Sequence, residues 1–120
     1  MPYAYLACAF LLNALANILL KLGSRTGLVL VHKDPISLLT NNWLLVLGCT
    51  VFAANVLFYF LALRALPISV AYPVMVVMSF IIINAYALLV LGESLSVLQA
   101  IGYAAIVLGL LLVLSNAPGV

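Results

Sequence analysis

The chain has 120 residues, of which 69% are hydrophobic and 5% are charged, and its formal net charge is +2. A soluble domain of this length buries only part of its chain and cannot hide so much apolar surface, so the composition indicates a protein whose solvent is lipid. The small net charge and the lack of a basic run argue against a nucleic-acid-binding protein.

Four apolar segments are each long enough to cross a hydrocarbon core as a helix, which takes about 20 residues. We expect helices because a helix satisfies its own backbone hydrogen bonds, which lipid cannot do. The segments are also continuous and do not alternate as strands would. The predicted fold class is therefore an all-α membrane protein, a bundle of four transmembrane helices in a single domain over residues 1–120. The spans are predicted at residues 3–22, 43–63, 69–91 and 96–115.

The first segment carries a polar stripe made of Asn13, Asn17 and Lys21. Residues four apart share one face of a helix. Polar groups are costly in a bilayer, so such a stripe usually faces a bundle interior, a partner or a polar pathway. One interpretation is packing, with the amides bonding neighbouring helices and the lysine reaching the headgroups. The other is a cavity whose donors face a ligand, because a lysine ammonium suits a phosphate or a carboxylate.

The joint after the first segment contains a helix-start signal. Asp34-Pro35 resembles an N-cap followed by proline at the first helical position, so we expect a short helix at Ile36–Leu39. Trp43 then opens the second span at the depth of an interfacial anchor.

The second and third spans add further polar residues. Asn55 is expected to bond another helix rather than a ligand. In the third span, Tyr72 precedes Pro73, and a proline inside a helix frees a carbonyl and predicts a kink. Met75 falls on about the same face as Tyr72, whereas Asn84 lies off that face and is expected to bond another helix.

The fourth span has candidate helix caps at its start and a set of small residues further along. Either Ser94 or Ser96 can cap its first turn. Gly102 and Gly109 are one heptad apart with Ala105 between them, which predicts a seam of small residues where two backbones approach closely. The sequence leaves open whether the partner of this seam is another part of the chain or another subunit.

The residues argue against an enzyme. The two acids, Asp34 and Glu93, both fall in predicted loops, so there is no carboxylate pair for acid–base chemistry. His32 is the lone histidine and has no partner at ligand spacing. We interpret Cys8 and Cys49 as buried small hydrophobic residues rather than as a disulfide or a metal pair. We therefore expect no catalytic residues, no cofactor and no metal.

The order of motifs along the chain resembles the drug/metabolite transporter superfamily. The resemblance is carried by the run Leu66–Pro73, by Gly92-Glu93-Ser94 and by the glycine-containing fourth span. The four-helix length is similar to the small multidrug resistance family and to the short EamA-type subunits, which include aminoarabinose-lipid flippases. The resemblance implies a homodimer or a heterodimer with a similar subunit in a bacterial or archaeal inner (cell) membrane. It also implies that the fourth helices form the seam and that the two halves rock around a midplane site in alternating access.

One departure separates the branches of that superfamily. Drug-exporting members carry a first-helix glutamate that binds a proton and a cationic substrate in turn, and Asn13 occupies that position here. Their third-helix tryptophan falls at Met75, whereas their tyrosine is kept as Tyr72. The glycolipid-flippase branch resembles this chain better, because it also lacks the glutamate and keeps a lysine four residues after a polar residue, as in Asn17 and Lys21.

The resemblance and the stripe together predict a transporter or flippase subunit for an anionic or lipid-linked small molecule. Lys21 would hold the phosphate, Asn13 and Asn17 would donate to the polar headgroup, and Tyr72 with Met75 would shape the cavity wall. Two alternatives remain open. One is a small multidrug resistance-type cation exporter, which Asn13 disfavours. The other is a non-transporting membrane interaction subunit in which the polar residues only join helices.

Overall fold

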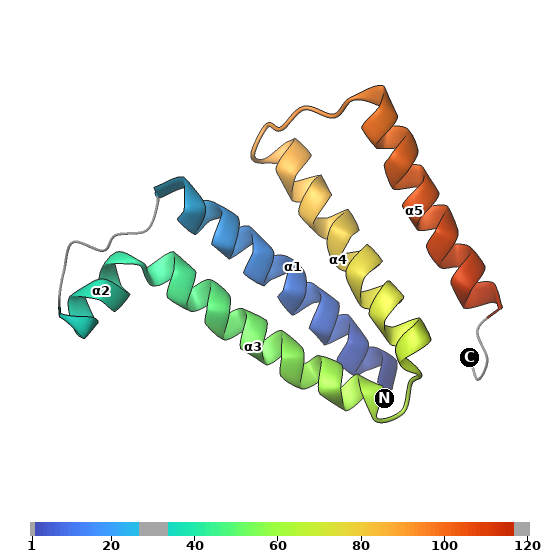
Figure 1. Ribbon diagram of the computed structural model, residues 1–120, viewed down its shortest axis with the longest axis horizontal. Coiled ribbons are helices and arrows are strands. Elements are labelled where there is room, and N and C mark those ends of the chain that lie inside the picture. The colour runs from blue at the N-terminus through green and yellow to red at the C-terminus, as the bar shows by residue number, and fades with distance from the viewer. Residues whose placement is uncertain (1, 27–33, 117–120) are drawn as a thin grey trace.

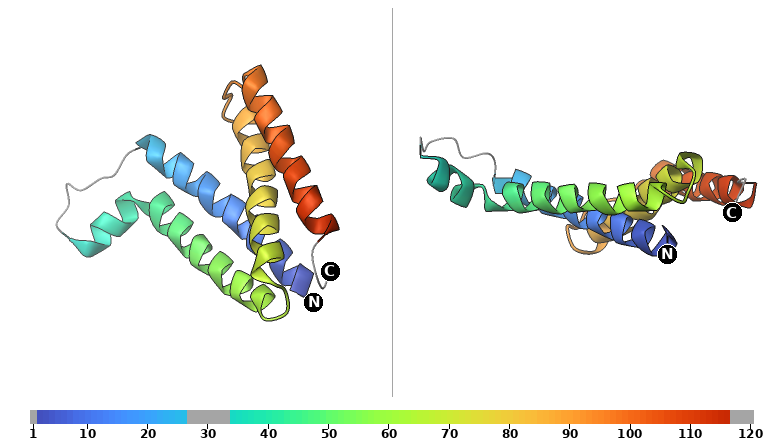
Figure 2. Two further views of the ribbon diagram at one scale, coloured as in Figure 1. Left: turned by 45° about the vertical axis from the view of Figure 1, so that its right-hand side comes forward. Right: turned by 90° about the horizontal axis from the view of Figure 1, so that it is seen from below.

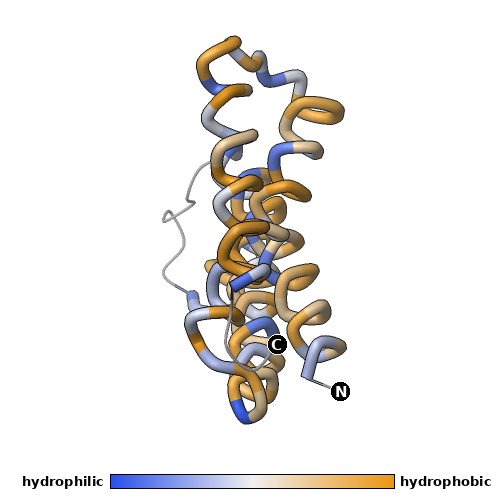
Figure 3. Tube along the Cα trace, turned by 90° about the vertical axis from the view of Figure 1, so that its right-hand side faces the viewer, coloured by the Kyte–Doolittle hydropathy of each residue, from blue (hydrophilic) through white to orange (hydrophobic). Residues whose placement is uncertain are grey.

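The computed structural model describes residues 2–26 and 34–116, and within these ranges the chain is helical with no strand (Figure 1). Four helices are long and apolar enough to cross a membrane, which indicates an integral multi-pass membrane protein. Hydrophobic residues run along most of their length (Figure 3). The helices are α1 (Pro2–Thr26), α2 (Pro35–Asn41), α3 (Trp43–Leu63), α4 (Ile68–Leu89) and α5 (Val97–Ser115).

The four long helices lie side by side in one layer, in the order α3, α1, α4, α5 (Figure 1). The layer measures 53 × 39 × 16 Å and is thin when seen edge-on (Figure 2). A helix with its side chains is about 10–12 Å across, so the layer is little more than one helix thick. No second layer covers either face in the described part of the chain. A path enclosed by protein on all sides therefore requires another subunit.

The packing of α1 against α3 depends on glycines. A Cβ atom at Gly23 would lie 3.1 Å from Leu44 Cβ, so the two helices approach closely near that end. Gly48 lies against α1 in the same way further along α3. Small residues at such contacts are the usual means by which membrane helices gain dispersion contacts, because lipid offers no hydrophobic drive for association.

The buried core is small and lies where the turn between α3 and α4 brings three helices together. Ser79 links α4 to α1 beside it, because its single hydroxyl proton is shared between the Phe10 carbonyl, 3.1 Å from Oγ, and the Met75 carbonyl, 2.6 Å from Oγ. Membrane helices use such hydroxyl bonds as interhelical links. The core cluster consists of Leu6, Ala9, Ala62, Leu66, Ala71 and Met75.

The helix bounds agree with the predicted spans to within a few residues. The second span was predicted at 43–63 and α3 is Trp43–Leu63. The largest difference is at the end of α1, which continues to Thr26 rather than stopping at Leu22. Hydropathy detects only the apolar part of a helix, and Ser24 and Arg25 prolong α1 beyond it.

Local capping explains where the later helices begin. The Asp34 side chain accepts from the Ile36 backbone N–H at 3.3 Å, and α2 follows with Pro35 as its first residue, as predicted. Of the two candidate caps for α5, the structure selects Ser96. Its Oγ accepts from the Gln99 backbone N–H at 3.1 Å while the Gln99 side chain accepts from the Ser96 N–H at 3.0 Å, which completes a capping box.

The expectations for the cysteines and for Asn84 are wrong, and one further expectation concerns a residue outside the described ranges. Cys8 and Cys49 were expected to be buried, but both are exposed and free, because the single layer leaves their sides of α1 and α3 uncovered. Asn84 was expected to bond another helix, but it donates to the Phe80 carbonyl of its own helix at 2.8 Å. His32 lies outside the described residues.

Candidate functional site

The polar stripe lies on one side of α1 and begins with the pair Asn13 and Asn17. Asn17 Nδ2 donates to the Asn13 backbone carbonyl at 2.8 Å and lies 3.5 Å from Asn13 Oδ1. Asn17 is exposed, whereas Asn13 is half-buried. Leu11 and Leu15 are also exposed, yet they lie roughly 160–200° around the helix from Asn13. One exposed side of α1 is therefore amide-lined and the other is aliphatic.

Asn55 of α3 joins the stripe. It is only 2% exposed, and its Nδ2 lies 3.5 Å from Asn13 Oδ1, at the outer limit of a hydrogen bond. The Asn55 Oδ1 atom is buried and has no partner, which is costly for a polar group away from water. The sequence treated Asn55 separately from the stripe. The structure brings Asn13, Asn17 and Asn55 together as an amide cluster between α1 and α3.

Lys21 lies near the end of α1, two turns beyond Asn13, and it is exposed. Its Nζ lies 3.9 Å from Glu93 Oε1, in the segment that connects α4 to α5. The side chains are 51% and 48% exposed, so the pair stays accessible to solvent and headgroups. Lys21 therefore lies at the end of the layer that carries the connection between α4 and α5.

The two predicted wall residues of α4 have different surroundings. Tyr72 is 54% exposed and its ring meets that of Tyr59 edge-on, with centroids 6.5 Å apart. Met75 is 8% exposed and belongs to the core cluster with Leu6 and Ala9. Tyr72 is thus exposed, whereas Met75 packs in the core. Pro73 lies inside α4, which runs through it without a break.

The predicted seam on α5 has no partner among the described residues. A Cβ atom at Gly102 or at Gly109 would meet nothing within 4 Å, and Ala105 is exposed. Of the long helices, α5 contacts α4 alone, through the edge-on pair of Phe80 and Tyr103, whose centroids are 4.8 Å apart. An internal partner is therefore excluded for the described part of the chain, and the seam is free to meet another subunit.

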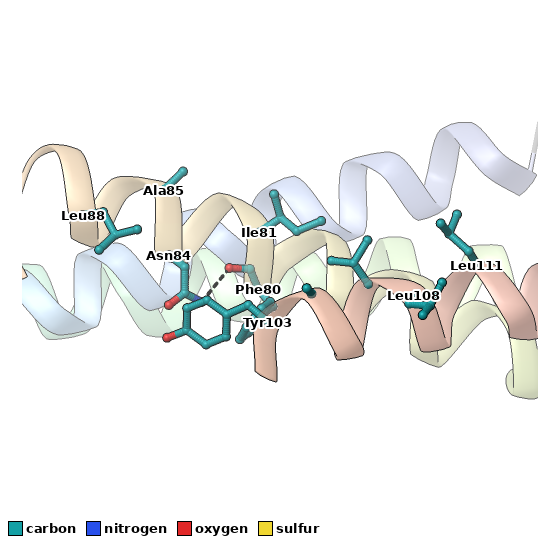
Figure 4. A pocket seen from close by; sticks show the side chains of 10 residues that line it. Phe80, Ile81, Asn84, Ala85, Leu88, Tyr103, Leu108 and Leu111 are labelled. Atoms are coloured by element: carbon teal, nitrogen blue, oxygen red, sulfur yellow. Dashed lines mark hydrogen bonds between the residues drawn. The ribbon is translucent and has the colours of Figure 1, made fainter. Parts of the chain in front are cut away.

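An apolar groove of about 550 Å³ runs between α4 and α5, and the sequence did not predict it (Figure 4). It contains none of the stripe residues. The one amide in its wall, Asn84, is occupied by its bond to the Phe80 carbonyl. The groove suits hydrocarbon rather than a polar headgroup. Its lining is Phe80, Ile81, Asn84, Ala85, Leu88, Tyr103, Ala104, Val107, Leu108 and Leu111.

The arrangement offers donors and one cation rather than a reactive centre. The stripe supplies amide N–H groups and an ammonium, which are chemically suited to an anion or a hydroxyl-rich group. Residues 2–26 and 34–116 contain no group of three or more His, Cys, Asp or Glu side chains placed to hold a metal ion. Comparison of the chain with family models, curated proteins and solved structures finds no match. The chemistry of the site is therefore the guide to function.

Proposed function

We propose that this chain is a subunit of a membrane transporter or flippase that moves an anionic or lipid-linked small molecule across the bilayer by alternating access. The observation that carries the proposal is the stripe on α1, in which Asn17 and Lys21 are exposed in a segment of otherwise apolar character. Polar groups that remain exposed at membrane depth are expensive unless they meet a polar path or ligand.

The single layer supports an assembly of two subunits. One copy leaves the amide-lined side of α1 uncovered, and the seam of Gly102 and Gly109 has no partner within residues 2–26 and 34–116. Two layers placed face to face would enclose the stripe, and a homodimer or a heterodimer with a similar subunit provides this. The stripe would then lie at the subunit interface, where rocking of the halves exposes it to each side in turn.

The roles follow from the positions of the side chains. Lys21 binds the phosphate or carboxylate near the membrane surface, and the amides of Asn13 and Asn17 donate to the polar headgroup as it passes deeper. Tyr72 forms part of the wall, with Met75 behind it. An apolar tail stays in lipid or between helices while the headgroup crosses, so the assembly need not enclose the whole molecule.

A second candidate has a specific observation in its favour. The contact between Asn55 and Asn13 joins two helices of the same chain, which is the behaviour of packing residues. In that case the chain is a non-transporting membrane interaction subunit, and its amides stabilise helix pairs. The cation-exporter function gains nothing from the structure, since Asn13 provides no counter-charge to a cation.

Translocation by purified protein in lipid vesicles tests the proposal. The probe is a phosphatidylglycerol with a fluorescent acyl label in phosphatidylcholine vesicles, and external dithionite reports how much of it reaches the outer leaflet. We expect translocation that Lys21→Ala lowers by roughly tenfold or more, because a hydrogen bond to a charged group contributes about 1.5–3 kcal/mol.

Two further variants and one further probe sharpen this test. Lys21→Arg should retain translocation, and Arg25→Ala, one turn beyond, should change it by less than about twofold because surface charges contribute little. Labelled phosphatidylcholine should move slowly in every case. Equal translocation by Lys21→Ala and the unaltered protein would remove the role of Lys21. A complete lack of translocation by the unaltered protein would favour the interaction subunit.

A further inference from the structure

The ion pair of Lys21 and Glu93 is the only one among the described residues, and it joins the end of α1 to the segment between α4 and α5. Nζ and Oε1 are 3.9 Å apart, and both side chains are about half exposed. The lysine proposed to hold an anionic group thus faces a carboxylate of its own chain.

The backbone fixes the position of Glu93 in front of the lysine. Gly92 has φ +68°, the left-handed conformation that ends many helices and that glycine adopts most easily. The Glu93 backbone N–H then donates to the Ala87 carbonyl at 3.0 Å, which closes the end of α4. The carboxylate is therefore presented by a capped helix end, so its approach to Lys21 follows from the backbone path.

Asp34, the other acid of the chain, is already engaged elsewhere. Its carboxylate accepts from the Ile36 N–H at 3.3 Å and lies 3.5 Å from Ser37 Oγ, where it caps α2. Glu93 is therefore the acid that meets Lys21.

We infer that Glu93 is a resident counter-ion that an anionic ligand must displace from Lys21, so that its carboxylate competes with every anion for the site. The inference rests on the proposed function and extends it. An ion pair between half-exposed side chains has little net stability, so a phosphate can replace the carboxylate at small cost. Any ligand whose anionic group pairs with Lys21 must first displace this carboxylate. Glu93 thus weakens the binding of every such anion by a modest factor.

Calorimetric titration of the full-length protein in a neutral maltoside detergent tests the exchange. The probes are dihexanoyl phosphatidate, inorganic phosphate and dihexanoyl phosphatidylcholine, and the first two separate a lipid headgroup from a free anion as the source of the phosphate. The variants are Glu93→Gln, Lys21→Ala, the two combined, and Asp34→Asn. The last is a matched control because it removes one negative charge from another acid of the chain, while asparagine still caps α2.

We expect Glu93→Gln to tighten phosphatidate binding by roughly 2–5-fold, because an exposed ion pair contributes at most about 1 kcal/mol. Phosphatidylcholine, which has no net negative charge, should gain less, so the preference for phosphatidate should widen. Lys21→Ala should abolish binding of phosphatidate, and adding Glu93→Gln to it should change nothing. Asp34→Asn should alter the affinity by less than about twofold.

Different results would contradict the exchange at Glu93 and the anion site at Lys21. If Lys21→Ala weakens binding but Glu93→Gln leaves it unchanged or weaker, the exchange is wrong and the anion site on Lys21 stands. If the gain from Glu93→Gln persists without Lys21, or Asp34→Asn gives the same gain, the effect is general charge and the exchange is again wrong. If Lys21→Ala binds as the unaltered protein does, or nothing binds phosphatidate or phosphate, the anion site itself is overturned.

Discussion

Gly48 of α3 lies directly against Leu20 of α1: a Cβ atom at Gly48 would stand 2.9 Å from Leu20 Cδ2 and 3.4 Å from the Leu20 backbone nitrogen. Atoms do not approach so closely without a shift of one helix or of the leucine. This contact therefore sets the distance between α1 and α3, and with it the place of Asn55 beside Asn13.

The first prediction follows from that contact. Gly48→Ala should destabilise the protein by about 1–3 kcal/mol, the usual cost of overpacking a filled site. Unfolding in mixed micelles with increasing SDS measures it. The matched test is the same substitution in a Leu20→Ala background, where the added methyl group has room and its penalty should shrink. Additive effects of the two substitutions would show that the glycine is not held against Leu20.

A second prediction concerns the start of α5. Ser96→Ala removes the side chain that accepts from the Gln99 N–H, and such a loss costs about 0.5–2 kcal/mol of local stability. Hydrogen exchange of the Gln99 amide should become faster as the first turn frays. Ser94→Ala, two residues earlier and outside the cap, should leave that exchange rate unchanged. The same acceleration in both variants would contradict the capping box.

The third prediction tests the proposed assembly through the seam on α5. Gly102→Leu should raise the dissociation constant of the dimer by at least tenfold, because a bulky side chain separates backbones that must approach closely. Subunit counting by photobleaching over a series of protein-to-lipid ratios measures this. Ala100→Leu adds similar bulk on another side of the same helix and should leave the dimer intact. Loss of the dimer in both variants, or in neither, would place the interface elsewhere.

A fourth prediction separates this protein from a proton-coupled cation exporter. Tetraphenylphosphonium added to the protein in weakly buffered micelles should release no protons, since an amide at position 13 does not titrate. Asn13→Glu should release protons under the same conditions, because a carboxyl group at membrane depth is held protonated by desolvation until a cation arrives. Empty micelles provide the baseline. Stoichiometric release of protons by the unaltered protein would support the cation-exporter function instead.

The sequence predicts the helices well, for a simple physical reason. A bilayer accepts only segments that satisfy their own backbone, so a long apolar run such as residues 43–63 has one stable form in lipid. The short helix α2 could also be predicted from the sequence, because Asp34-Pro35 is a local signal for the start of a helix. These features depend on residues close together in the chain.

Side-chain surroundings were harder to predict because they depend on which helices become neighbours. Cys8 and Cys49 lie in apolar segments, yet the single layer leaves them exposed. Asn84 donates to the Phe80 carbonyl of its own helix, a local bond that competes with any bond to another helix. The spacing of the stripe was visible in the sequence, whereas the meeting of Asn13 with Asn55 requires the register of α1 on α3. Close contacts such as Gly48 with Leu20 fit that register, and they join residues far apart in the chain.

A layer of helices 16 Å thick buries few of its side chains. The lipid or detergent around the layer therefore contacts most of its side chains. The detergent used for extraction is consequently expected to affect whether two subunits stay associated. If the working unit is a pair, dilution into micelles separates it by mass action while every helix stays intact. Helical content measured after purification would then report nothing about whether the pathway has survived.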